Sequence, residues 1–159
     1  MQAILTFVFL FLFFGSAAHG DAHIEDLTVR VEGNKVAASF RLQDAFHRRL
    51  RERLDSGLPT SIVYQFELHR DRKRWYDRRL RENTLEVVAI YDAVAREYMV
   101  NYKLDDKLVE SRTVRDKQAL AEAMTHVGPL PVFTLDELPR SWRLLLKVRA
   151  ELGSRMVLV

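Results

Sequence analysis

The 159-residue sequence contains no cysteine, and it has only six glycines and four prolines. The absence of cysteine excludes disulfide bonds and attachment to a membrane as a lipoprotein, so we expect packing and backbone pairing to stabilise the fold. The glycines form neither a phosphate-binding loop nor the G-x-S-x-G turn found in many hydrolases. The sequence also shows no internal repeat and no low-complexity stretch. These absences leave a single compact domain as the expected organisation.

Positive charge is absent from the N-terminal part of the chain, where no lysine or arginine precedes Arg30. The residues from Ala3 to Phe14 are apolar with one exception, and small residues follow as far as Ala18. A short apolar segment that ends in small residues is typical of a secretory signal peptide. We therefore predict a signal peptide at residues 1–20, cleaved before Asp21 or, alternatively, directly after Ala18.

A membrane anchor that is never cleaved is the alternative interpretation of the same segment. As a helix, residues 3–18 would extend about 24 Å, because each residue adds about 1.5 Å. A bilayer core is about 30 Å thick and needs ~20 apolar residues, so the segment is short for an anchor. We expect residues 21–159 to form one exported domain in the periplasm. A protein anchored in the inner membrane by its N-terminus remains the alternative.

Most of the exported part alternates apolar and polar residues, which is the pattern of half-buried strands. The predicted strands cover residues 27–31, 36–42, 62–69, 85–91, 98–104, 108–114 and 144–152. Gly33 and Asn34 tolerate positive φ and predict a tight hairpin between the first two strands. The apolar residues that we expect to share one core are Phe40, Tyr64, Phe66, Val87, Tyr98, Val100 and Leu146.

Two segments have the period of a helix instead. Asp44 is predicted to cap a helix whose apolar face carries Phe46, Leu50 and Leu54, and Gly57 ends it. The arginines of this segment lie off that face and are expected to be solvated: Arg48, Arg49, Arg51 and Arg53.

The second predicted helix follows Asp116, which is expected to cap it. Its apolar face carries Leu120, Met124 and Val127, and Gly128 with Pro129 is expected to end it. The fold class is therefore mainly β, an antiparallel sandwich of about seven strands with two short helices. An α+β arrangement, with the helices packed on one sheet, is the alternative.

The order of several short segments resembles an exported proteobacterial family known as domain of unknown function number four-three-nine-zero. The segments that carry the resemblance are Ile24 to Val29, Leu42 to Phe46, Leu54 to Pro59, Tyr64 to Leu68, Trp75 to Arg78, Tyr91 to Ala93 and Arg96 to Tyr98. The resemblance covers about residues 22 to 152. It implies an envelope location and a fold but assigns no activity. Members are often encoded beside a nitrogen-regulation-type sensor kinase, which implies such a kinase as a partner.

The most strongly charged segment runs from His69 to Arg81 and is called the basic arm here. The residues that form its candidate anion-binding or partner-binding patch are Arg70, Arg72, Lys73, Arg74, Trp75, Tyr76, Arg78 and Arg79. Basic residues interleaved with aromatic residues are typical of nucleic-acid binding, but the exported location argues against that partner. An anionic membrane surface or an acidic protein fits better. A solvated strand connection, with Trp75 and Tyr76 on the sheet edge, is the structural alternative.

The sequence shows no convincing catalytic, cofactor-binding or metal-binding residues. His23 and Glu25 form the best metal candidate, but a site needs three or four ligands that converge. We therefore expect a protein that is not an enzyme and needs no cofactor. The predicted function is a periplasmic binding or adaptor module that docks on another envelope protein. A peripheral membrane-surface protein that uses the basic arm is the alternative.

Overall fold

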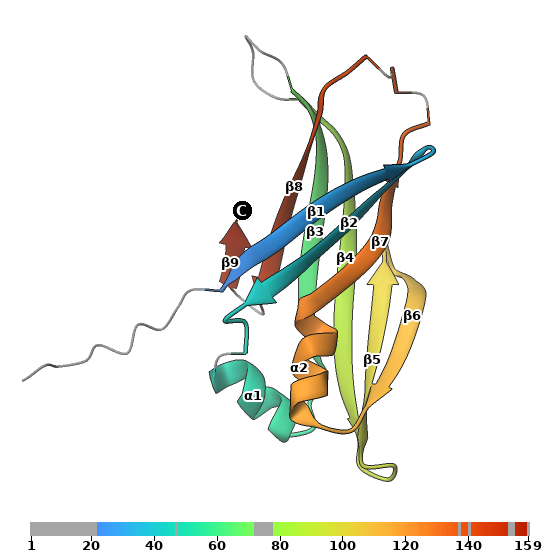
Figure 1. The fold of residues 1–159 in the computed structure, drawn as a ribbon. Coiled ribbons are helices and arrows are strands. Elements are labelled where there is room, and N and C mark those ends of the chain that lie inside the picture. The colour runs from blue at the N-terminus through green and yellow to red at the C-terminus, as the bar shows by residue number, and fades with distance from the viewer. Residues whose placement is uncertain are drawn as a thin grey trace, which may run out of the picture.

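A computed structural model describes residues 22–46, 48–71, 78–136, 138–139, 141–152 and, for the backbone only, 155–158. The described residues form two antiparallel sheets and two helices (Figure 1). The larger sheet has the strand order β6-β5-β4-β3-β8-β9, with β6 Lys107–Val114, β5 Glu97–Leu104, β4 Arg78–Asp92, β3 Thr60–Arg70, β8 Leu144–Leu152 and β9 Arg155–Leu158. The smaller sheet has the order β1-β2-β7, with β1 His23–Glu32, β2 Lys35–Gln43 and β7 His126–Thr134. The helices are α1 Arg48–Asp55 and α2 Lys117–Thr125.

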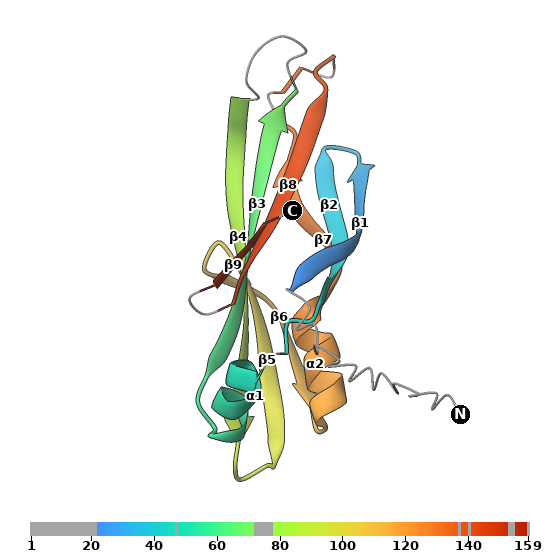
Figure 2. The same ribbon diagram turned by 90° about the vertical axis from the view of Figure 1, so that its left-hand side faces the viewer.

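The smaller sheet and both helices lie on the same face of the larger sheet. In Figure 2 the smaller sheet covers the upper part of this face, and the helices lie below it. Side chains alternate across a strand, so every second residue of β3 points into the space between these layers. The mainly-β fold predicted from the sequence is confirmed.

The centre of the core is a group of aromatic side chains from both sheets. The Phe40 ring lies 5.0 Å from the Tyr64 ring and 6.0 Å from the Phe66 ring, measured between centroids. All but one of the predicted core residues are buried, and Leu146, the exception, is half-buried and packs against the same cluster. The alternation of β2, β3, β4 and β5 therefore identified the inward face correctly.

Two strands were not predicted, so the described residues contain nine strands rather than about seven. β9 adds an edge to the larger sheet beyond β8. β7 occupies residues that were assigned to the end of the second helix. This helix stops at Thr125, where His126 caps it, and Val127 reaches the core from β7 rather than from α2.

The predicted cap of α1 is also wrong, whereas the cap of α2 is correct. Asp44 has a φ of 55°, and α1 begins only at Arg48, so Asp44 does not cap the helix. Asp116 has the extended backbone of a helix cap, and its carboxylate accepts a hydrogen bond from the Ala119 backbone N–H at 2.7 Å.

The burial predicted for β1 is wrong, although its strand conformation is correct. Leu27, Val29 and Val31 are 36%, 44% and 60% exposed. Val29 pairs with Ala38 and Val31 with Val36, so these side chains point toward the larger sheet. They stay exposed because β1 is the edge strand of the smaller sheet.

Candidate functional site

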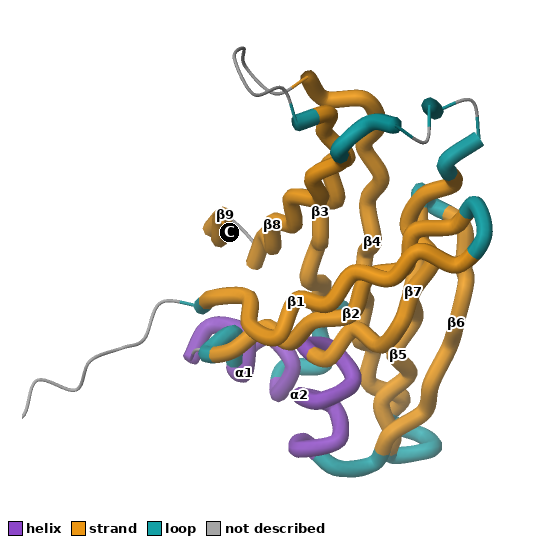
Figure 3. The backbone as a smooth tube through the Cα atoms, turned by 45° about the horizontal axis from the view of Figure 1, so that its top comes forward, coloured by secondary structure: helices purple, strands orange, loops and turns teal. Residues whose placement is uncertain are grey.

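A pocket of about 310 Å³ opens between the two helices. Figure 3 shows α1 and α2 side by side at the same end of the sheets. The residues that line the pocket are Phe46, Arg51, Leu54, Asp55, Tyr98, Lys117, Gln118, Leu120 and Ala121. Leu54, Tyr98 and Leu120 are buried and form its apolar interior, while the charged lining residues are exposed. An apolar hollow with a few polar groups at its opening is the usual form of a small-molecule site.

The orientation of α1, which forms one side of the pocket, follows directly from its sequence. Leu50 and Leu54 are one turn apart and both are buried, so the short helix packs on the sheet through this face. Arg51 is exposed, as predicted for the arginines of this segment. The structure adds that Arg51 borders the pocket, which the helical period alone did not indicate.

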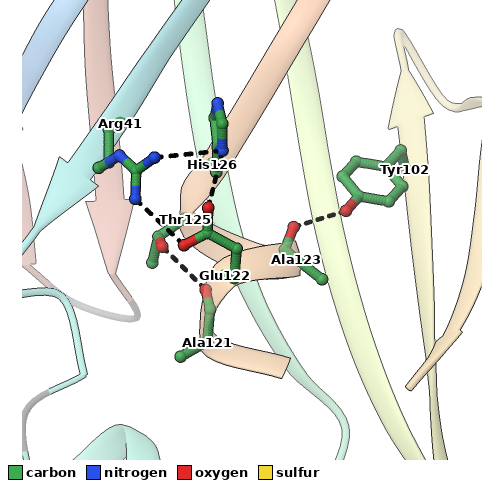
Figure 4. A network of polar contacts seen from close by, with 7 residues as sticks. All are labelled: Arg41, Tyr102, Ala121, Glu122, Ala123, Thr125 and His126. Carbon is green, nitrogen blue, oxygen red and sulfur yellow. Dashed lines mark hydrogen bonds and ion pairs between the residues drawn. The ribbon is translucent and has the colours of Figure 1, made fainter. Parts of the chain in front are cut away.

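Two tyrosines of the larger sheet hold the C-terminal end of α2 in place. The last carbonyl groups of a helix have no partner inside the helix. The Tyr64 hydroxyl donates to the Met124 carbonyl at 2.9 Å. The Tyr102 hydroxyl donates to the Ala123 carbonyl at 2.5 Å, as Figure 4 shows. Burial raises the pKa of both hydroxyl groups, so both remain protonated donors.

The outer side of α2 is tied to the smaller sheet by charged groups. The Arg41 guanidinium on β2 donates to the Glu122 carboxylate at 3.2 Å, and the His126 Nδ1 atom lies 2.8 Å from the same carboxylate (Figure 4). Among the described residues, no group of three or more histidine, aspartate or glutamate side chains is placed to hold a metal ion. His23 and Glu25 form a hydrogen bond of 2.8 Å with each other. We infer that the contacts among Arg41, Glu122 and His126 hold α2 against the smaller sheet.

Two cationic side chains and one carboxylate lie at the rim of the pocket. The Lys117 ammonium donates a hydrogen bond to the Asp55 carboxylate, which joins the two helices across the opening. This hydrogen bond, together with the charge of Asp55, raises the pKa of Lys117. The Arg51 Nε atom donates to the Phe46 carbonyl at 2.7 Å. The rim therefore carries a net positive charge.

The described residues of the basic arm lie where β3 ends and β4 begins, at the end of the sheets opposite the helices (Figure 1). Arg70 pairs with Arg78 across the two strands. The Arg70 guanidinium stacks on the Trp142 ring at 4.0 Å, Arg78 is exposed, and Arg79 forms an ion pair of 2.8 Å with Glu82. The other residues of the predicted patch lie outside the described residues: Arg72, Lys73, Arg74, Trp75 and Tyr76. The structure therefore brings together only the base of the arm.

A buried polar pair lies next to this base and was not predicted from the sequence. Glu67 and His69 point away from the core, yet both are buried. The Glu67 carboxylate lies 2.7 Å from the His69 Nε2 atom and accepts a hydrogen bond of 2.7 Å from Arg149 on β8. Within the described part of the chain, the buried His69 Nδ1 atom has no hydrogen-bond partner. A glutamate and a histidine two residues apart on a predicted central strand are the signal that could have indicated this pair.

Neither described helix is long and apolar enough to cross a bilayer. Searches of curated proteins and of solved structures find no match to the chain. Residues 20–156 match the protein family described as "Domain of unknown function (DUF4390)". The match includes both helices and all but the last residues of β9, so it extends over the whole fold and not over one motif. The chain therefore belongs to the DUF4390 family.

Proposed function

We propose that this protein is a non-enzymatic binding or adaptor module of the bacterial envelope, and that it holds a small apolar ligand between α1 and α2. The observation that carries the proposal is the pocket of about 310 Å³ with its apolar interior. Its volume lies at the lower end of the range of about 300–1,000 Å³ for small-molecule sites. The exported location is supported by the apolar segment from Ala3 to Ala18.

The chemistry of the pocket supports binding rather than catalysis. The described residues that line it include no histidine, serine or threonine. A hydroxyl nucleophile next to a histidine base, the arrangement of many hydrolytic sites, is therefore missing from the described lining. The rim provides charge for recognition, and the interior provides apolar surface for affinity. In this proposal the occupied module docks on another envelope protein, such as the sensor kinase implied by the family resemblance.

Filling the pocket is expected to abolish the binding of apolar molecules. Ala121→Phe places a ring between the helices, so the affinity for the apolar probe 1-N-phenylnaphthylamine should fall at least tenfold. Ala93→Phe is the matched control, because Ala93 is exposed in the turn between β4 and β5 and does not line the pocket, so this change should leave the affinity unchanged. Probe fluorescence measures the binding, and a melting curve shows that each variant is folded. Equal affinity of wild type and Ala121→Phe, or no probe binding by folded wild type, would refute the proposal.

The position of the basic arm favours a second function, attachment to an anionic membrane surface. The end of β3 and the start of β4 form one extremity of the molecule, opposite the helices, so a flat surface can approach it (Figure 1). Arg78 is exposed there. Each lysine or arginine near an anionic headgroup layer contributes about 1 kcal/mol, and salt shortens the reach of this attraction to about 8 Å.

Binding to anionic vesicles is expected to weaken steeply between low and moderate salt if the arm works in this way. Replacing Arg72, Lys73 and Arg74 by glutamine should then abolish co-sedimentation with the vesicles. The control replaces three exposed cationic residues on other elements by glutamine: Arg30, Arg49 and Lys107. This control removes the same charge and should retain most of the binding. Binding that does not depend on salt concentration would rule out the arm as a membrane contact. Equal loss of binding in both triple variants would rule it out as well.

A further inference from the structure

The charges at the rim restrict what kind of ligand the pocket accepts. Among the described residues, the two terminal nitrogens of Arg51 have no hydrogen-bond partner, because only its Nε atom donates to Phe46. Lys117 has three donor hydrogens, of which the bond to Asp55 uses one. The rim therefore offers donors to an additional anion without breaking any contact that it already makes. A cationic head group would instead be repelled by Arg51 and Lys117.

The interior restricts the rest of the ligand. Leu54 and Leu120 are buried on the two helices, and Tyr98 is buried on β5 between them. β5 is hydrogen-bonded to β4 on one side and to β6 on the other, so it has no free edge where a peptide could add a strand. The middle of each helix has its backbone paired internally, and only the N–H groups of the first turn and the carbonyl groups of the last turn lack a partner inside the helix. An occupant therefore gains affinity mainly from burying apolar surface.

We propose that the pocket binds a single-chain fatty acid, with the acyl chain between α1 and α2 and the carboxylate at the rim formed by Arg51 and Lys117. This inference rests on the proposed binding function and names the ligand class. Guanidinium groups match the two oxygens of a carboxylate, so Arg51 is the residue that recognises the head group. Lys117 adds a second positive charge.

The affinity should depend on chain length in a characteristic way. Each additional methylene that enters the pocket should raise the affinity about fourfold, equivalent to about 0.8 kcal/mol. The increase should stop when the chain exceeds the space between the helices. Calorimetric titration of the full chain with hexanoate, octanoate, decanoate and dodecanoate, all below their micelle concentrations, measures this dependence.

The head group is tested at constant chain length with decanoate, decanol and decylammonium. Decanoate should bind most tightly and decylammonium most weakly. Arg51→Gln should weaken decanoate about fivefold and leave decanol unchanged, since an exposed ion pair contributes up to about 1 kcal/mol. Arg49→Gln is the matched control, because Arg49 is exposed on the same helix but does not line the pocket. It should change neither affinity.

The outcomes separate this inference from the binding function on which it rests. If neither decanol nor decanoate binds the folded protein, the pocket is not a ligand site and both proposals fail. If decanol binds as tightly as decanoate, or if Arg51→Gln has no effect on decanoate, the pocket binds apolar ligands but the fatty-acid assignment is wrong. A lysophosphatidic acid of equal chain length that binds more tightly than the fatty acid would overturn the carboxylate head group in favour of a phosphate.

Discussion

Replacing Phe66 with alanine is expected to lower the free energy of unfolding by about 3–5 kcal/mol. Phe66 lies on β3, between β4 and β8 in the larger sheet, and its side chain is fully buried. Its ring packs against Phe40 of the smaller sheet at 6.0 Å between centroids. Alanine removes this contact between the sheets and leaves a cavity that the strands on either side cannot close. Because domains of this size are stable by about 5–15 kcal/mol, the variant should be close to unfolding.

Urea unfolding of the two proteins, followed by circular dichroism, measures this difference. Leu108→Ala is the control, because Leu108 lies on the edge strand β6 and is 61% exposed. This substitution should change the stability by less than about 0.5 kcal/mol. If Phe66→Ala costs as little as the control, the two sheets do not share the core described here.

The inward-facing residues of the inner strands of the larger sheet were predictable because each of these strands is covered on one face only. β3 and β5 alternate a buried residue with a less buried one over most of their length, and β4 does so between residues 84 and 90, so the sequence period matches the burial there. β1 shows why the same reasoning fails at an edge. Leu27, Val29 and Val31 alternate as well, but among the described strands only β2 pairs with β1, and these side chains stay 36%, 44% and 60% exposed. What covers a strand is decided by the packing of layers, which a local pattern does not contain.

β7 was missed for a different reason. Its sequence contains Gly128, Pro129 and Pro131, and such residues normally argue against a strand. Proline is tolerated at sheet edges and at bulges, and β7 is an edge strand of the smaller sheet. Its pairing with β2 also shifts register on both sides of Ala37 and Ala38. The prolines therefore mark an irregular edge strand and not the loop after a helix.

The candidate pocket could be predicted only in part. The apolar face with Leu54 on α1 and the face with Leu120 on α2 were each recognised as the buried side of a helix. That they face one space follows from the topology, which also brings Asp55 and Lys117, 62 positions apart in the sequence, into an ion pair. Contacts over such distances follow from topology, and topology was beyond the reach of periodic patterns.

Replacing Glu67 with glutamine is expected to lower the free energy of unfolding by about 1.5–3 kcal/mol near neutral pH, the usual contribution of a hydrogen bond to a charged group. The Glu67 side chain is only 5% exposed, and its carboxylate contacts His69 on β3 and Arg149 on β8. Glutamine preserves the size of the side chain but removes the negative charge. Arg149 and His69 would then lie beside a neutral group in a site with little water.

The loss should depend on pH, because the contacts of Glu67 change its ionisation. The hydrogen bond with His69 lowers the pKa of the Glu67 carboxyl below its ordinary value of 4.5, against the effect of burial, and the positive charges of Arg149 and Arg79 act in the same direction as His69. A carboxyl with a lowered pKa stabilises the folded state above the pKa of the unfolded chain. This contribution disappears as the pH falls through the lower pKa of the folded state.

The difference in stability between wild type and Glu67→Gln should therefore be full near neutral pH and shrink below about pH 4.5. Lys147 on β8 and Glu82 on β4 also lie opposite Glu67 across the strands. Since these groups are present in both proteins, wild type and Glu67→Gln must both be measured at each pH by urea unfolding. Glu82→Gln is the control, because this carboxylate is 41% exposed and its ion pair with Arg79 should contribute less than about 1 kcal/mol. A difference for Glu67→Gln that stays constant from neutral to acidic pH would show that the charge of Glu67 does not stabilise the base of the arm.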